Sequence, residues 1–133
     1  MIESLKSIQS QGRRKLFPLE KFKLEKPIET VDIIPEIEKF SDVERKALFK
    51  NLIGIELTAG CTSGCSDCYL MIPHGVTSRV SFSSFEEVIK RYHDELPEYV
   101  DFHYGNEPFD WNEGDKGLVD IYKTYKKYRP QAE

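Results

Sequence analysis

Apolar and polar positions along the chain predict strands and helices in alternation. Residues 52–58 form an apolar, partly β-branched run that leads into Ala59 and Gly60, which indicates a buried strand of a parallel sheet. Residues 99–104 alternate between apolar and polar positions and end at Gly105, which predicts the next strand. Because strands separated by helices build βαβ units, this order predicts an α/β fold with parallel strands.

The same pattern predicts three helices. Ser41 and Glu44 have the spacing of a capping box and open a short helix of roughly three turns. Ser83 and Glu86 repeat that spacing ahead of a longer apolar stripe. The stripe consists of Phe85, Val88, Ile89, Tyr92 and Leu96, with Pro97 as its stop. The last helix is marked by Leu118, Ile121, Tyr122 and Tyr125 and is closed by Arg129 and Pro130.

The chain changes character near residue 40. Residues 1–40 are punctuated by lysines and prolines without a sustained period, so we expect a lead-in with short elements before a domain at 41–133. Residues 1–27 carry seven Lys and Arg against three acids, a balance of +4, whereas the remainder carries 12 basic and 20 acidic residues, a balance of −8. A basic terminus is more often a solvated lead-in than a binding arm. The net negative charge of residues 28–133 argues against an extended nucleic-acid-binding surface there.

The hydropathy of the chain gives no sign of a membrane span or a secretory signal. No apolar run approaches the roughly 18–20 residues that a membrane span needs, and no signal-peptide segment follows Met1. We therefore expect a cytoplasmic protein without membrane attachment, whose thiols stay reduced. Its 39% hydrophobic and 32% charged residues are typical of a globular chain and not of a disordered one.

All three cysteines lie within one short segment, as Cys61, Cys65 and Cys68. An odd and tightly spaced set indicates a metal or cluster site more than a disulfide framework. The spacing C-x3-C-x2-C lets three thiolates converge from one loop, and thiolates are the ligands of iron–sulfur clusters. On a four-iron cluster, three thiolates would leave one iron open to a substrate or cofactor. Gly60 and Gly64 give the backbone freedom that wrapping around a cluster requires.

Three other interpretations of the cysteines stay open. Zinc needs four ligands, and His74 is the nearest candidate for the fourth, although structural zinc sites are usually built from two knuckles. A redox pair at Cys65 and Cys68 would leave Cys61 without a role. The third alternative is a set of reduced cysteines with no special function. We favour the cluster.

A second unusual segment, Gly105-Asn106-Glu107-Pro108, follows the second predicted strand, as the cysteines follow the first. In α/β sheets and barrels, functional sites lie at the carboxyl ends of the strands. Neighbouring parallel strands would therefore place the two segments side by side. Glu56 interrupts the first apolar run, and either faces this site or is a paired structural residue.

These two motifs, in this order and on these elements, resemble the radical S-adenosylmethionine enzymes. Cys61, Cys65 and Cys68 match the family's cysteine motif, and residues 105–107 are similar to its glycine-rich "GGE" motif with Asn106 in the middle. The resemblance covers residues 50–128 at most. It implies the first two βα units of a partial (βα)6 TIM-like barrel, preceded by the lead-in and a short helix. Since such a core is longer than 133 residues, we expect a truncated core whose function belongs to a longer enzyme.

The resemblance also implies a chemistry. The three cysteines would hold a [4Fe-4S] cluster, and its fourth iron would bind S-adenosylmethionine, which one electron cleaves to methionine and a 5′-deoxyadenosyl radical. Gly105, Asn106 and Glu107 would hold the methionyl ammonium. The family usually has an aromatic residue near the adenine just before the third cysteine; Asp67 stands there, and Tyr69 is the candidate for this contact.

Partners and competing functions follow from the same comparison. An electron donor such as flavodoxin or ferredoxin would reduce the cluster, whereas the substrate is not predicted. The first alternative is a non-catalytic zinc module built from the three cysteines and His74. The second alternative is a cluster-bearing subunit without radical activity.

Overall fold

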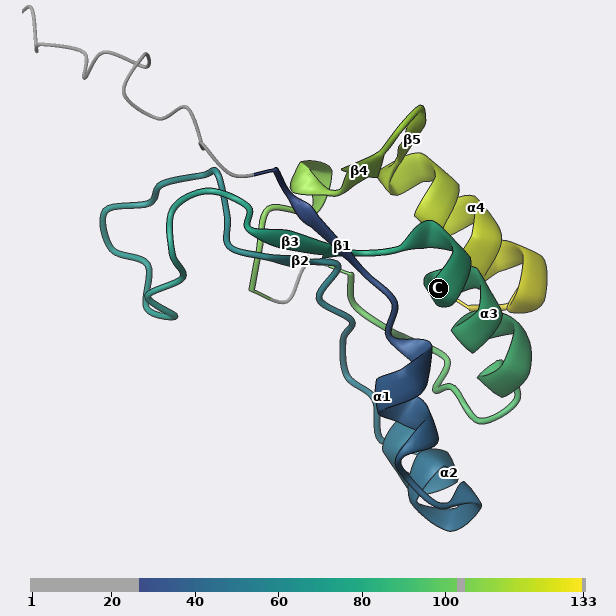
Figure 1. Ribbon diagram of the computed structural model, residues 1–133. Helices are drawn as coiled ribbons and strands as arrows, with labels where there is room; N and C mark the ends of the chain where they lie inside the picture. The colour runs from purple at the N-terminus through teal and green to yellow at the C-terminus, as the bar shows by residue number, and fades with distance from the viewer. Residues whose placement is uncertain (1–26, 103–104, 133) are drawn as a thin grey trace, which may run out of the picture.

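The structure is a computed structural model that describes residues 27–102 and 105–132. Its α-helices are α1 (Ile34–Glu38), α2 (Asp42–Lys50), α3 (Phe82–Tyr92) and α4 (Leu118–Tyr128). Its strands are β1 (Glu29–Val31), β2 (Thr58–Ala59), β3 (Ser78–Val80), β4 (Asn112–Glu113) and β5 (Lys116–Gly117), and a 3₁₀ turn, η3, spans Pro108–Asp110. Figure 1 shows α3 and α4 side by side, with the small sheet next to them and α1 and α2 at one end.

Three strands form a mixed sheet in the order β1-β3-β2. The central strand β3 pairs in parallel with β1 and antiparallel with β2, so that Arg79 lies between Thr30 and Thr58. Strands β4 and β5 form a separate antiparallel hairpin. The described residues therefore form a small mixed α/β fold with short strands and no parallel barrel-like unit.

The predicted barrel units are thus wrong. Of the apolar run 52–58, only Thr58 enters a strand, and Gly54 makes an isolated parallel bridge to Asp101 in the second predicted strand. Two backbone bonds make this bridge, from Ile55 N–H to Asp101 O at 2.8 Å and from Asp101 N–H to Ile53 O at 3.0 Å. The rest of the second prediction, 103–104, lies outside the described residues.

The reason is the route that the chain takes after β2. A parallel unit would lead from the strand through a loop into a helix, but here the chain folds back and pairs antiparallel as β3 before α3 begins. Val80 N–H donates to Leu57 O at 2.9 Å, which places the end of β3 against the end of the apolar run. An apolar run predicts burial and not the identity or direction of its partner.

Of the three predicted helices, the structure confirms the first and the last and corrects the ends of the second. The capping box of α2 is confirmed, with Ser41 accepting from the Glu44 backbone and the Glu44 side chain accepting from Ser41. The second predicted box is wrong: Ser81, not Ser83, caps α3, and the helix ends at Tyr92 instead of running to Leu96. The last helix, 118–128, is confirmed.

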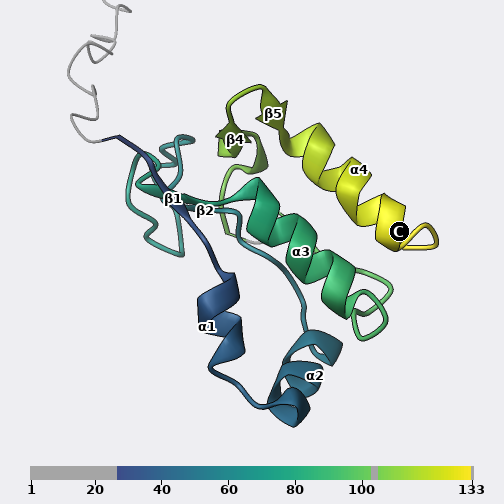
Figure 2. The same ribbon diagram turned by 45° about the vertical axis from the view of Figure 1, so that its right-hand side comes forward.

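A compact core joins α3 and α4. Ile89 and Ile121 are fully buried between the two helices, and the Phe102 ring meets the ring of Tyr125 edge-on at 5.2 Å between centroids. Trp111 is 1% exposed and donates from Nε1 to Val80 O at 2.9 Å, which ties the segment after η3 to the sheet. Figure 2 shows the same pairing of helices from another side. We call α3, α4 and Trp111 the helical body.

The stretch expected as a lead-in contributes to this fold. Its β1 pairs with β3, and Ile34 and Ile37 of α1 pack against the core. The basic residues between positions 6 and 26 lie outside the described residues. Within the described part of the chain, no helix is long and apolar enough to cross a membrane.

Candidate functional site

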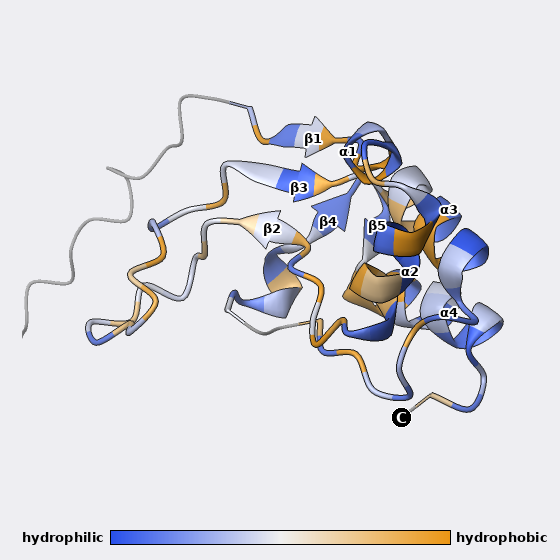
Figure 3. Ribbon diagram, turned by 90° about the horizontal axis from the view of Figure 1, so that it is seen from below, coloured by the Kyte–Doolittle hydropathy of each residue, from blue (hydrophilic) through white to orange (hydrophobic). Residues whose placement is uncertain are grey.

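The cysteine loop, residues 60–75, connects β2 to β3 and projects from the sheet on the side away from α3 and α4 (Figures 1 and 3). Its two ends are held together by backbone bonds from Cys61 N–H to Pro73 O at 3.1 Å and from Gly75 N–H to Cys61 O at 2.8 Å. A third bond, from Thr77 N–H to Ala59 O at 2.9 Å, continues the pairing below. The two ends of the loop, at residues 60–61 and 73–75, are therefore fixed against each other; we call these residues the neck of the loop.

Glycine is required at this neck. Gly60 has a φ of +88°, a region that L side chains rarely adopt, and a Cβ there would lie 1.9 Å from Gly75 O. Because that oxygen belongs to the backbone, no side-chain rotation could relieve the overlap. The close approach of the two chain segments next to Cys61 thus depends on this residue.

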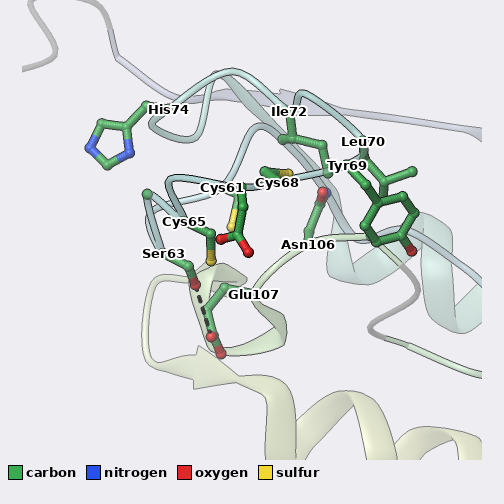
Figure 4. Close-up of a pocket in the computed structure, with 13 residues that line it drawn as sticks. Cys61, Ser63, Cys65, Cys68, Tyr69, Leu70, Ile72, His74, Asn106 and Glu107 are labelled. Carbon is green, nitrogen blue, oxygen red and sulfur yellow. Dashed lines mark hydrogen bonds between the residues drawn. The ribbon is translucent and has the colours of Figure 1, made fainter.

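A cavity of about 820 Å³ opens between the cysteine loop and the segment 105–107. Its lining includes Cys61, Cys65, Cys68, Tyr69, His74, Gly105, Asn106 and Glu107, several of which are labelled in Figure 4. The remaining lining residues are Ser63, Gly64, Asp67, Leu70 and Ile72. The structure thus gathers every predicted site residue around one space, although the barrel that was expected to do so is absent from the described residues.

The three thiols differ in exposure. Cys61 and Cys68 are half-buried and Cys65 is exposed. Within residues 27–102 and 105–132, no three His, Cys, Asp or Glu side chains lie close enough together to hold a metal ion as they stand. The donor set itself fits an iron–sulfur cluster, because thiolates are the ligands such clusters take and the cysteines share one exposed loop. Holding it requires the loop to close further.

His74 fits a zinc site less well. Its backbone is bridged to Cys61, and its ring lies over Gly64, where a Cβ would be 3.1 Å from Cε1. In Figure 4 the imidazole points away from the labelled cysteines. His74 lines the cavity, but its ring is not directed toward the thiols.

The side chains of residues 106 and 107 make different contacts: Asn106 is bonded to β2 and Glu107 to the cysteine loop. Asn106 Nδ2 donates to the backbone oxygen of Thr58 and, at 3.3 Å, to its hydroxyl. Glu107 accepts from Ser63 Oγ at 3.2 Å, the dashed line in Figure 4, and from Phe109 N–H at 3.3 Å. Asn106 therefore has a structural contact that a glycine could not make, and the Glu107 carboxylate faces the cysteine loop.

The sequence does not predict a further contact of the cysteine loop, with Asp110 of η3. Asp110 accepts two hydrogen bonds from Thr62, one from its N–H at 2.7 Å and one from its hydroxyl at 2.5 Å. Thr62 directly follows Cys61. No motif marks this pair, since its members stand 48 positions apart.

Gly105 and Glu56 meet behind the cavity. A Cβ on Gly105 would lie 2.6 Å from Glu56 Oε1 and 3.0 Å from Leu70 Cδ1. Glu56 therefore approaches Gly105, whose lack of a side chain makes room for it, but Glu56 is not among the residues that line the cavity, and its orientation toward the site stays a prediction.

Apolar side chains stand in solvent at the rim. Tyr69 is 81% exposed and Met71 is 85% exposed, with Met71 at a φ of +49°. Figure 4 shows the Tyr69 ring at the end of the cavity opposite His74. The predicted contact of Tyr69 with an adenine ring remains a prediction.

The charged side chains at the cavity are of one sign. Asp67 and Glu107 contribute carboxylates, and among the described lining residues there is no Lys or Arg. A site with this charge favours a cationic ligand over an anionic one.

Comparisons of this chain with models of protein families, with curated proteins and with solved structures give no match.

Proposed function

We propose that this chain binds a [4Fe-4S] cluster through Cys61, Cys65 and Cys68 and that the cluster acts together with S-adenosylmethionine in radical chemistry. One observation carries the proposal: the three cysteines and the Gly105–Glu107 segment, both identified in the sequence, line the same cavity. The two segments lie more than 35 positions apart in the sequence, and one side-chain hydrogen bond, from Ser63 Oγ to the Glu107 carboxylate at 3.2 Å, joins them. This juxtaposition does not depend on a barrel.

The protein's own residues have distinct tasks in this proposal. The three thiolates would hold three irons, because no fourth cysteine exists in the sequence. The carboxylate of Glu107 would accept a hydrogen bond from the ligand's ammonium, a charge-assisted contact that is stronger than a neutral one. When bound, the cluster supplies one electron that cleaves the carbon–sulfur bond of S-adenosylmethionine.

The charge of the cavity supports this ligand. S-adenosylmethionine carries an ammonium and a sulfonium against one carboxylate and is therefore a cation overall, and the carboxylates of Asp67 and Glu107 line the space in which it would bind. An anionic substrate would meet no Lys or Arg among the described lining residues. Leu70 and Ile72 add apolar surface for the uncharged part of the ligand.

Two external requirements follow. The cluster needs reduced thiols, so we place the protein in a reducing compartment such as the cytoplasm. It also needs an electron donor, for which flavodoxin or ferredoxin is the proposed type. The substrate is an unidentified molecule from which the radical would take a hydrogen atom.

Anaerobic reconstitution with iron and sulfide tests the cluster. We expect a brown protein that absorbs near roughly 400 nm, as clusters do. A colourless protein that instead takes up one zinc per chain would contradict the proposal and support the zinc module. Addition of dithionite and S-adenosylmethionine to the loaded protein then tests the chemistry. Formation of 5′-deoxyadenosine is expected, whereas a loaded cluster without this product would indicate a subunit lacking radical activity.

Glu107→Ala separates ligand binding from cluster binding. The variant should keep the iron content of the wild type and bind S-adenosylmethionine at least about tenfold more weakly, because one charge-assisted contact is lost. Glu98→Ala is the matched control, since Glu98 is exposed and does not line the cavity. Loss of both iron and ligand in Glu107→Ala would mean that this carboxylate is structural.

A further inference from the structure

The contact between Asp110 and Thr62 has a geometry that no motif of the chain accounts for. Both carboxylate oxygens of Asp110 are used, one by the backbone N–H of Thr62 and the other by its hydroxyl. This two-point contact fixes the orientation of a residue as well as its position. Thr62 is exposed to solvent, so the contact is not a by-product of core packing.

Asp110 is itself held on a rigid support. It is the last residue of η3, where its N–H donates to Glu107 O at 3.0 Å. The following residue, Trp111, is 1% exposed and is bonded to Val80 O. A carboxylate between a hydrogen-bonded turn and a buried tryptophan has few ways to move. The helical body thus reaches the cysteine loop through Asp110.

Because Thr62 is next to Cys61, its contact with Asp110 also restrains the backbone of that cysteine. Cys61 precedes it directly, and the backbone on the other side of Cys61 is fixed by the bonds to Pro73 and Gly75. The backbone at Cys61 is therefore held from both sides, by these two bonds and by the contact of Thr62 with Asp110.

We propose that Asp110 is a positioning residue of the cysteine loop: by holding Thr62, it sets the orientation of Cys61 in which the loop accepts the cluster. The inference rests on the proposed function. It adds that this carboxylate, which is hydrogen-bonded to the residue next to the proposed ligand Cys61, also contributes negative charge near the cluster. Negative charge near a cluster lowers its reduction potential.

The first test needs no cluster. Amide hydrogen exchange of the metal-free protein should show Thr62 N–H protected in the wild type. In Asp110→Asn it should exchange about fivefold faster or more, because a neutral acceptor replaces a charged one. Asp115→Asn, which removes the same charge from the exposed β4–β5 turn, should leave the Thr62 exchange unchanged. Equal exchange rates in all three proteins would overturn the inference.

The second test uses the reconstituted protein. Asp110→Asn should shift the midpoint potential of the cluster upward relative to both the wild type and Asp115→Asn. Thr62→Val should lower the iron content, and Thr62→Ser, which keeps the hydroxyl, should restore it. An unchanged potential together with full iron content in Thr62→Val would contradict the inference.

Two outcomes keep the proposals apart. If the wild type takes up no cluster, the proposed function fails, and the amide exchange still decides whether Asp110 holds Thr62. If Asp110→Asn loses its circular dichroism spectrum through unfolding, the Thr62→Val and Thr62→Ser pair decides the inference, because Thr62 is exposed and its replacement spares the core.

Discussion

The helical body is held together by buried apolar side chains, whereas the cysteine loop is held by hydrogen bonds. In the helical body, Ile89, Ile121 and Trp111 are at most 1% exposed, and apolar packing holds α3 against α4. In the loop, Tyr69 and Met71 are more than 80% exposed, and the order comes from backbone bonds at the neck and from side chains that reach across from η3. The buried side chains of the core are thus distinct from the side chains that line the cavity.

A core substitution should have the largest effect on stability. Ile121→Ala removes a fully buried side chain at the contact of α3 and α4, and we expect a loss of about 2–5 kcal/mol in the free energy of unfolding. Urea unfolding followed by circular dichroism measures it. The solvent-facing neighbour substitution Val119→Ala, at a residue 60% exposed, is the control and should change stability little. Equal losses in both variants would remove the distinction between the two regions.

The neck of the loop should be the next most sensitive place. Gly60→Ala brings a Cβ against the backbone oxygen of Gly75 at a positive φ, so we expect a loss of about 3 kcal/mol or more. Gly114→Ala is a matched control, because its φ of +61° is also positive but nothing lies within 4 Å of the added Cβ. That control should lose only about 1–2 kcal/mol. If urea unfolding gave the same loss in both variants, the close approach at Gly60 would not matter.

Replacing a cysteine should affect cluster loading strongly and the stability of the fold very little. Cys65→Ala alters an exposed residue, so the unfolding free energy should change by less than about 0.5 kcal/mol. Cluster loading should nevertheless be abolished, which iron analysis after reconstitution measures. Ser66→Ala, an exposed neighbour in the same loop, should keep its iron. Full iron content in Cys65→Ala would contradict the ligand assignment.

A small gain is expected at the rim. Met71 adopts a φ of +49°, a left-handed conformation that asparagine tolerates better than methionine. Met71→Asn should therefore stabilise the protein by a few tenths of a kcal/mol, up to about 0.5. Thermal unfolding compares it with Met71→Ala, which lacks that tolerance and should not be stabilised. A destabilised Met71→Asn would indicate that the exposed methionine has a packing role.

The sequence predicts best what is local. The capping box of Ser41 and Glu44 and the stripe of the last helix depend on residues three or four positions apart, and both are confirmed. The buried positions Phe85, Val88 and Ile89 also follow from periodicity. Contacts within one helical turn depend mainly on neighbouring residues, but the equally local box at Ser83 and Glu86 is wrong, because Ser81 caps α3.

The pairing of strands that lie far apart in the chain could not be predicted from the sequence. The apolar run 52–58 predicts burial, but β2 pairs antiparallel with β3 through the return of the cysteine loop, and this depends on Gly60 and Gly75 approaching each other. The contact of Asp110 with Thr62 depends on the same tertiary arrangement. The two motifs predicted from the sequence line one cavity, although the architecture assumed for bringing them together was wrong, and the roles of their residues stay predictions.

In the proposed site, three cysteines leave one iron open to S-adenosylmethionine. Electron paramagnetic resonance of the reconstituted, dithionite-reduced protein, recorded with and without S-adenosylmethionine, tests it most directly. We expect a cluster signal that changes when S-adenosylmethionine is added, because the ligand would bind the iron that no cysteine holds. A cluster signal that is identical in the presence and absence of S-adenosylmethionine would mean that the ligand does not bind an open iron.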